Sequence, residues 1–167
     1  LKQESTPINS IVRQWNYIES ITEIDSCGQR YQQFNDARSS FYAQTHWPFG
    51  YPAATGIGVS SGGVIVEVNA VKNANLKPID NALQVPAHKY SEAVLMCGTE
   101  KVASSPKFER AKLQDDKWLY ISGTAAIRGE KNIDLLSEEQ TKITLENIDD
   151  LLCRAAMTAE DLVALRV

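Results

Sequence analysis

The spacing of apolar residues along the chain predicts short strands that alternate with two helices. Residues 64–72 are the clearest strand, because β-branched side chains dominate that segment. Apolar runs predict further strands at residues 93–97, 111–113, 118–122 and 162–167. Asp115 and Asp116 are expected to turn the chain between the segments 111–113 and 118–122.

Helical spacing is clear over residues 28–44, where aromatic side chains recur in steps of three and four. Arg38 lies within this aromatic stripe. It either covers the rings with its aliphatic stem or points into a pocket. The spacing of Trp15 and Ile18 also predicts a short helix or an irregular segment over residues 11–24.

The second predicted helix covers residues 137–155. Ser137 and Gln140 have the spacing of a capping box, in which each side chain bonds an amide at the start of the helix. Its apolar stripe includes Leu151 and Leu152, and we expect Cys153 beside them in the core.

Loops are predicted between these elements. Residues 46–51 and 98–108 are expected to be loops, and residues 73–85 a connection. Residues 52–58 are a run of small side chains that feeds the following strand. Their glycines do not form a nucleotide-binding loop, because a strand follows them instead of a helix and no Lys-Ser or Lys-Thr pair is present.

The composition is that of an ordinary globular chain, with 167 residues, 17 Lys plus Arg and 21 Asp plus Glu. The net charge of −4 argues against a general nucleic-acid binder, which needs a basic face. No apolar run approaches the length of a membrane span, and the first ten residues do not resemble a secretion signal. The three cysteines are odd in number, and the only histidines are His46 and His88. Together these features predict a cytoplasmic protein with reduced thiols and no metal site.

Several blocks of sequence resemble a known family. The order of a strand, the Ser-Gly-Thr-Ala sequence of residues 122–125 and a helix containing Thr144-Leu-Glu-Asn-Ile resembles the first half of a RidA/YjgF-type domain. Upstream, four blocks resemble the N-terminal domain of chorismatases: residues 13–17, 29–35, 52–58 and 106–111. The chain is therefore similar to the chorismatase-like branch of the RidA/YjgF superfamily.

This resemblance implies an α/β (α+β) fold, with a mixed sheet and helices packed on one of its faces. Residues 1–113 would form an N-terminal domain, and residues 114–167 the first half of a second domain that is incomplete at its C-terminus. The resemblance also implies a substrate cleft near the domain junction. It allows either a monomer or a trimer of the RidA type.

The activity that the resemblance implies is hydrolysis of chorismate, or of a related enolpyruvyl acid, with release of pyruvate. Protonation of the enol carbon requires a protonated carboxylic acid in a shielded site. In the family this acid is a Glu that would lie beyond Val167, so the catalytic residues are unassigned. The alternatives are an enamine or imine deaminase of the RidA type and a ligand-binding protein without catalysis. Such relatives are often described as endoribonucleases or translation initiation inhibitors, but the net charge argues against RNA cleavage.

The binding residues predicted from the resemblance serve a small anionic substrate, with no cofactor, metal, nucleic acid or membrane. Arg110 is either a clamp for an anion or an exposed arginine on an edge strand. Tyr90 stands for a family tyrosine near the cleft, although its surrounding residues depart from the family pattern. The other four predicted binding residues follow a predicted strand. They either present backbone amides and a hydroxyl to a substrate carboxylate or simply form a tight turn. They are Ser122, Gly123, Thr124 and Ala125.

Overall fold

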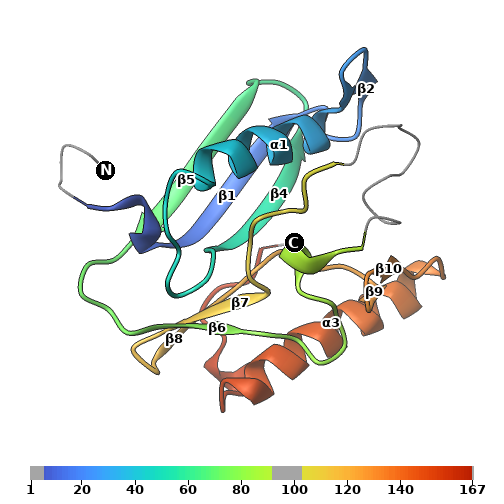
Figure 1. Cartoon of the computed structure of the whole chain (residues 1–167). Helices are drawn as coiled ribbons and strands as arrows, with labels where there is room; N and C mark the ends of the chain where they lie inside the picture. Colours follow the sequence, from blue (N-terminus) through green and yellow to red (C-terminus); the bar gives the residue numbers. More distant parts are fainter. Residues whose placement is uncertain (1–5, 92–102, 167) are drawn as a thin grey trace.

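The first sheet is built around β1 (Ile11–Glu19), which has a neighbouring strand on each side. β4 (Ala53–Val59) runs parallel to it and β5 (Val64–Ala70) antiparallel, so that Trp15 pairs with both Thr55 and Glu67. The computed structural model describes residues 6–91 and 103–166 (Figure 1).

The prediction of a helix or an irregular segment over residues 11–24 is wrong, because most of it is this central strand. Burial alternates from Gln14 onward, but the fully buried side of the strand carries polar side chains and the half-buried side carries Trp15 and Tyr17. The polar and apolar positions are therefore the reverse of the usual pattern of a half-buried strand. The strand also buries Arg13, Gln14 and Asn16. Their hydrogen bonds, and not apolar character, allow this burial, and an apolar pattern does not show it.

Helix α1 (Arg30–Tyr42) lies across one face of this sheet (Figure 1), which confirms the helix predicted over residues 28–44. It buries Asn35, Arg38 and Tyr42, whereas Phe41 is 54% exposed. The predicted aromatic stripe is therefore only partly buried, and two of the three buried side chains on this face are Asn and Arg. Tyr42 donates a hydrogen bond to Gln14 Oε1 at 2.5 Å, which attaches the end of the helix to β1.

A second, antiparallel sheet contains β6 (Leu76–Ile79), β7 (Ala111–Gln114) and β8 (Trp118–Ile121). The predicted hairpin of β7 and β8 is confirmed. Asp115 and Asp116 both have positive φ, as in the tight turns that match the twist of a hairpin.

The structure corrects the prediction that residues 73–85 are only a connection, because β6 lies within them. Pro78 and the polar residues around it hid the strand in the sequence. β6 is an edge strand, where proline is tolerated because one side of the strand has no partner in the sheet.

Helix α3 (Ser137–Arg154) lies beside the second sheet (Figure 1) and confirms the second predicted helix. The capping box is wrong: Leu136 is the N-cap and Ser137 is already helical, so its side chain bonds no amide there. Gln140 instead donates to the Leu135 carbonyl oxygen. Cys153 is exposed and not in the core, because the buried face contains Asn147, Leu151 and Leu152.

Short elements complete the described chain. They are η1 (Ile8–Ser10), β2 (Ile24–Asp25), β3 (Gly28–Gln29), η2 (Ala87–Lys89), β9 (Ile127–Arg128), β10 (Lys131–Asn132) and η3 (Ala159–Asp161). Residues 52–58 do not merely feed a strand but largely form β4. The strand predicted at residues 93–97 lies outside the described residues.

The strand predicted at the C-terminal end is also wrong, because residues 162–166 form no ladder with another strand and are exposed. Their apolar composition is typical of strands, but β-propensity reflects the packing of side chains against neighbouring strands. Arg166 instead contacts β1: its Nη1 donates to Tyr17 Oη, and its guanidinium lies over the Trp15 ring.

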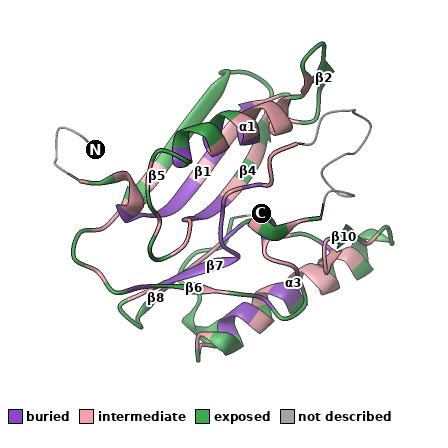
Figure 2. Ribbon diagram, viewed as in Figure 1, coloured by how far each residue is buried: buried purple, intermediate pink, exposed green. Residues whose placement is uncertain are grey.

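Buried residues concentrate along β1, the start of β4, β7 and the inner side of α3 (Figure 2). The mixed α+β class is confirmed by these sheets together with α1 and α3. Among the described residues, no helix is both long enough and apolar enough to cross a bilayer.

This burial pattern predicts that substitution of two leucines of α3 has very different effects on the free energy of unfolding. Leu151 is 1% exposed and Leu145 is 54% exposed. We expect Leu151→Ala to lower the free energy of unfolding by about 2–5 kcal/mol, because it leaves a cavity. Leu145→Ala is expected to change it by less than about 0.5 kcal/mol. Urea unfolding of both variants measures the difference, and equal effects would contradict the packing described for α3.

Candidate functional site

The two sheets are joined at the end of β8 by Ser122, which is 4% exposed. Its hydroxyl accepts a hydrogen bond from the Ala54 amide at 2.8 Å and donates to the Glu109 carbonyl oxygen at 2.5 Å. The next amide, that of Gly123, donates to the Ala54 carbonyl oxygen and to Thr55 Oγ1. We call these contacts of Ser122 and Gly123 the seam. The seam connects β4 of the first sheet to β8 of the second.

A pocket of about 410 Å³ lies beside the seam. Its walls come from β1 and β4, from α1, from Tyr90, from the segment 106–110 and from residues 123–132. These walls lie on both sides of the predicted domain boundary at residue 113, although the boundary itself stays a prediction. The volume is in the range of cavities that hold small organic ligands.

The pocket brings together five of the six predicted binding residues: Tyr90, Arg110, Gly123, Thr124 and Ala125. Ser122 is not in its lining, because its hydroxyl is used within the seam. The Gly123 amide is likewise bonded to the protein. The amides of Thr124 and Ala125 have no partner among the described residues, so they are the two amides of this turn that remain for a ligand.

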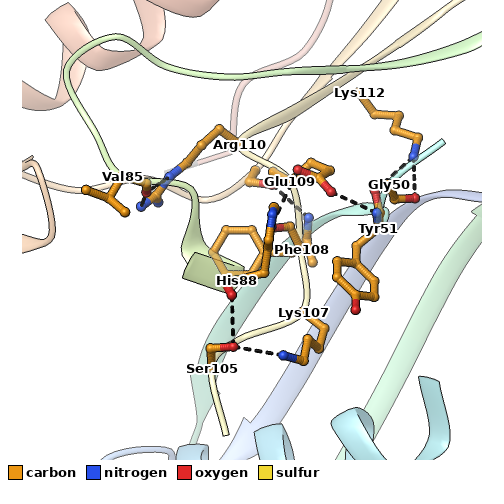
Figure 3. Close-up of polar contacts among 12 residues, drawn as sticks. Gly50, Tyr51, Val85, His88, Ser105, Lys107, Phe108, Glu109, Arg110 and Lys112 are labelled. Carbon is orange, nitrogen blue, oxygen red and sulfur yellow. Dashed lines mark hydrogen bonds and ion pairs between the residues drawn. The ribbon is translucent and has the colours of Figure 1, made fainter. Parts of the chain in front are cut away.

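Arg110 is not an exposed edge arginine, since only 3% of it is accessible. Its Nε and Nη2 donate to the Val85 carbonyl oxygen at 3.1 and 2.5 Å (Figure 3). Nη2 also donates to Tyr90 Oη at 2.7 Å. Both partners are neutral, and no carboxylate of the described chain forms an ion pair with this guanidinium. Arg110 is therefore held in place while its positive charge remains available to an anion.

The residues on either side of Arg110 fix its backbone. Glu109 Oε1 accepts from the Tyr51 amide at 2.9 Å, and Lys112 Nζ donates to three consecutive carbonyl oxygens, those of residues 49–51 (Figure 3). Burial lowers the pKa of Lys112 to about 8. Gly50 has a φ of +72°, and a Cβ there would lie 2.5 Å from Glu109 Oε1. These hydrogen bonds therefore fix the position of the loop at residues 49–51 relative to the segment 109–112.

The carboxylate that lines the pocket among the described residues is that of Glu130. It accepts hydrogen bonds from the amide and the hydroxyl of Ser91, at 2.8 and 2.6 Å. These bonds lower the pKa of Glu130, so the side chain is ionised near neutral pH. It is poorly suited to donate a proton, and the general acid stays unassigned. The described residues also contain no group of three His, Cys, Asp or Glu side chains that could hold a metal ion.

Sequence reasoning missed several residues of the lining, among them Asn16, Tyr31 and Glu130. Asn16 is 1% exposed and donates to the Thr55 carbonyl oxygen at 3.1 Å. It was missed because its segment was interpreted as helical or irregular. No sequence signal could have found it, because the buried side of this strand carries the polar side chains Gln14 and Asn16, which ordinarily indicate exposure.

Comparisons with known proteins agree with this architecture. Residues 2–70 match the family model for the N-terminal part of FkbO/Hyg5-like chorismatases. The chain is 28% identical to a 3-hydroxybenzoate synthase of Streptomyces hygroscopicus, over 93% of this chain and 47% of that relative. It is 30% identical to a chorismatase of Streptomyces rapamycinicus, over 83% of this chain and 42% of that relative.

A crystal structure of a chorismatase superposes with a TM-score of 0.77 and 25% sequence identity. The match covers 94% of this chain and 48% of the solved one. The chain therefore spans about half the length of the relatives it matches. The three comparisons show that the chain is similar to FkbO/Hyg5-like chorismatases, whereas the wider RidA/YjgF placement stays a prediction.

The close contact at the seam generates a prediction about Gly123. A Cβ there would lie 2.5 Å from Thr55 Cγ2, so Gly123→Ala is expected to lower the free energy of unfolding by about 1–3 kcal/mol through overpacking. Thr55→Ser removes Cγ2 but keeps the hydroxyl. The double variant T55S/G123A is therefore expected to be more stable than the two single effects added together, as measured by urea unfolding. Strict additivity would show that the contact is not the cause.

Proposed function

We propose that this chain supplies the carboxylate-binding part of a chorismatase-like hydrolase. The reaction is the hydrolysis of chorismate, or of a related enolpyruvyl acid, with release of pyruvate. The observation that carries the proposal is Arg110, a buried guanidinium that lines the pocket with Tyr90 and has only neutral partners among the described residues. Similarity to proteins named chorismatase over most of the chain supports this choice of substrate class.

The chemistry assigns this part of the protein a binding role. Addition of a proton to the enol carbon gives an oxocarbenium-like centre, which water attacks. The resulting hemiketal breaks into pyruvate and the ring alcohol, so one water is consumed. Arg110 and Tyr90 would hold a substrate carboxylate through charge-assisted hydrogen bonds. The Thr124 and Ala125 amides would bond a polar oxygen of the same substrate.

Glu130 is not the proton donor in this proposal, because its bonds from Ser91 favour the ionised form. The acid would come from outside the described lining of the pocket, as the family resemblance implies. A cytoplasmic location, a RidA/YjgF origin and a monomer or RidA-type trimer are further parts of the proposal.

The direct test is release of pyruvate from chorismate by the purified full-length protein, which contains this chain, followed through NADH oxidation by lactate dehydrogenase. We expect a rate that is proportional to protein concentration and absent from a heat-denatured control. A rate equal to that without protein would overturn the proposed function. Ammonia release from an enamine substrate, without pyruvate release from chorismate, would favour the deaminase alternative.

Removal of the Arg110 charge predicts a specific kinetic change. Arg110→Met keeps the approximate length of the side chain but loses the guanidinium, so KM for chorismate is expected to rise about 10- to 100-fold. Arg154→Met is the matched control, because Arg154 is exposed on α3 and pairs with Asp150 away from the pocket. Steady-state kinetics of both variants measure the effect. An unchanged KM for Arg110→Met would remove Arg110 from the binding site.

A further inference from the structure

Helix α1 brings a second guanidinium to the same pocket, that of Arg38. The residue is only 7% exposed, although it is one of the lining residues. It lies one helical turn after Asn35, and its Nη2 donates to Asn35 Oδ1 at 2.8 Å. Its guanidinium lies 5.3 Å from the centre of the Phe34 ring.

These contacts do not neutralise the positive charge of Arg38. The partners just named are an amide and an aromatic ring, and no carboxylate among the described residues forms an ion pair with it. Nε is buried and has no hydrogen-bond partner among the residues that the structure describes. Burial also lowers the pKa of Arg38, which reflects the cost of holding this charge away from water.

Other buried polar atoms next to Arg38 also lack hydrogen-bond partners among the described residues. Asn35 is fully buried, yet its Nδ2 has no hydrogen-bond partner in the described part of the chain. The Oγ atom of Ser39 is also buried there without a partner. Buried polar groups in folded proteins are nearly always bonded, so unsatisfied groups on one helix face require an explanation. Burial and, as a smaller cause, the charge of Arg38 lower the pKa of Lys107, so a second positive charge lies near Arg38. Unsatisfied donors and positive charge together match the needs of an anion.

We propose that Arg38, positioned by Asn35, binds a second anionic group of the substrate, so that the pocket selects small acids with two carboxylates. This inference rests on the proposed function, in which Arg110 and Tyr90 hold the first carboxylate. Arg110 comes from the segment that leads into β7, and Arg38 from α1. The two charges therefore reach the ligand from different elements of the fold and set where its two carboxylates lie.

The test compares two ligands that differ by one carboxylate, benzoate and isophthalate (benzene-1,3-dicarboxylate), by isothermal titration calorimetry. We expect the unmodified protein to bind isophthalate more tightly than benzoate. Arg38→Met should weaken isophthalate binding about 10- to 100-fold and benzoate binding less than about threefold. Arg38→Lys, which keeps the charge without the fork of donors, should show an intermediate loss.

The matched control is Arg30→Met, which removes a positive charge from the same helix at a position that pairs with Glu23 and does not line the pocket. It should leave the preference for isophthalate unchanged. Thermal unfolding of each variant identifies a loss of folding. Equal weakening of both ligands by Arg38→Met would show a merely structural role and overturn the proposal. A protein that binds isophthalate no more tightly than benzoate would also overturn it.

Kinetics with chorismate separate this inference from the proposed function. If Arg38 binds a carboxylate, Arg38→Met raises KM for chorismate about 10-fold or more, beyond the change caused by Arg30→Met. Absence of pyruvate release would defeat the proposed function but would leave a preference for isophthalate that depends on Arg38. Pyruvate release with a KM that Arg38→Met does not change would defeat only the inference about Arg38.

Discussion

The pocket depends on the seam, where the buried hydroxyl of Ser122 joins segments that are distant in the sequence. It accepts a hydrogen bond from β4 and donates one to the backbone before β7, while the adjacent amide of Gly123 bonds back to β4. A buried hydroxyl that lost either partner would carry the cost of an unsatisfied polar group. The two sheets therefore have one favourable position relative to each other, and the pocket walls on either side are fixed with them.

Around the seam, two arginines, Arg110 and Arg38, are buried without a carboxylate partner among the described residues. Arg110 and Arg38 are held by carbonyl, phenol and amide groups, all of which are neutral. Burial of an unpaired charge is unfavourable, so these residues reduce stability when nothing is bound. The overall charge of −4 gives no indication of this local field. A ligand in the pocket is close to the guanidinium groups of Arg110 and Arg38, although the chain as a whole is acidic. The charge near the ligand depends on which side chains line the pocket and not on the net charge.

Local sequence patterns predicted those helices and strands whose conformation depends mainly on residues close by in the sequence. The hairpin of β7 and β8 was predictable, because Asp115 and Asp116 favour the tight turn between two apolar runs. The helices were also predictable from their spacing. β1 and β6 were not, because the buried side of β1 carries the polar side chains Gln14 and Asn16, and a proline on an edge strand resembles a loop in the sequence. The exposure of Cys153 depended on which face of α3 met the sheet.

The sequence by itself determined the class of fold, most of the helices and strands, and the residue types available to bind a small acid. It also carried the resemblance that led to Arg110, Tyr90 and the turn at residues 122–125. Only the tertiary structure showed that Ser122 joins the sheets while Thr124 and Ala125 line a pocket, and that Arg38 shares this pocket. The physical reason is that hydrogen-bond satisfaction and burial depend on groups far apart in the chain, and local patterns do not record those distances.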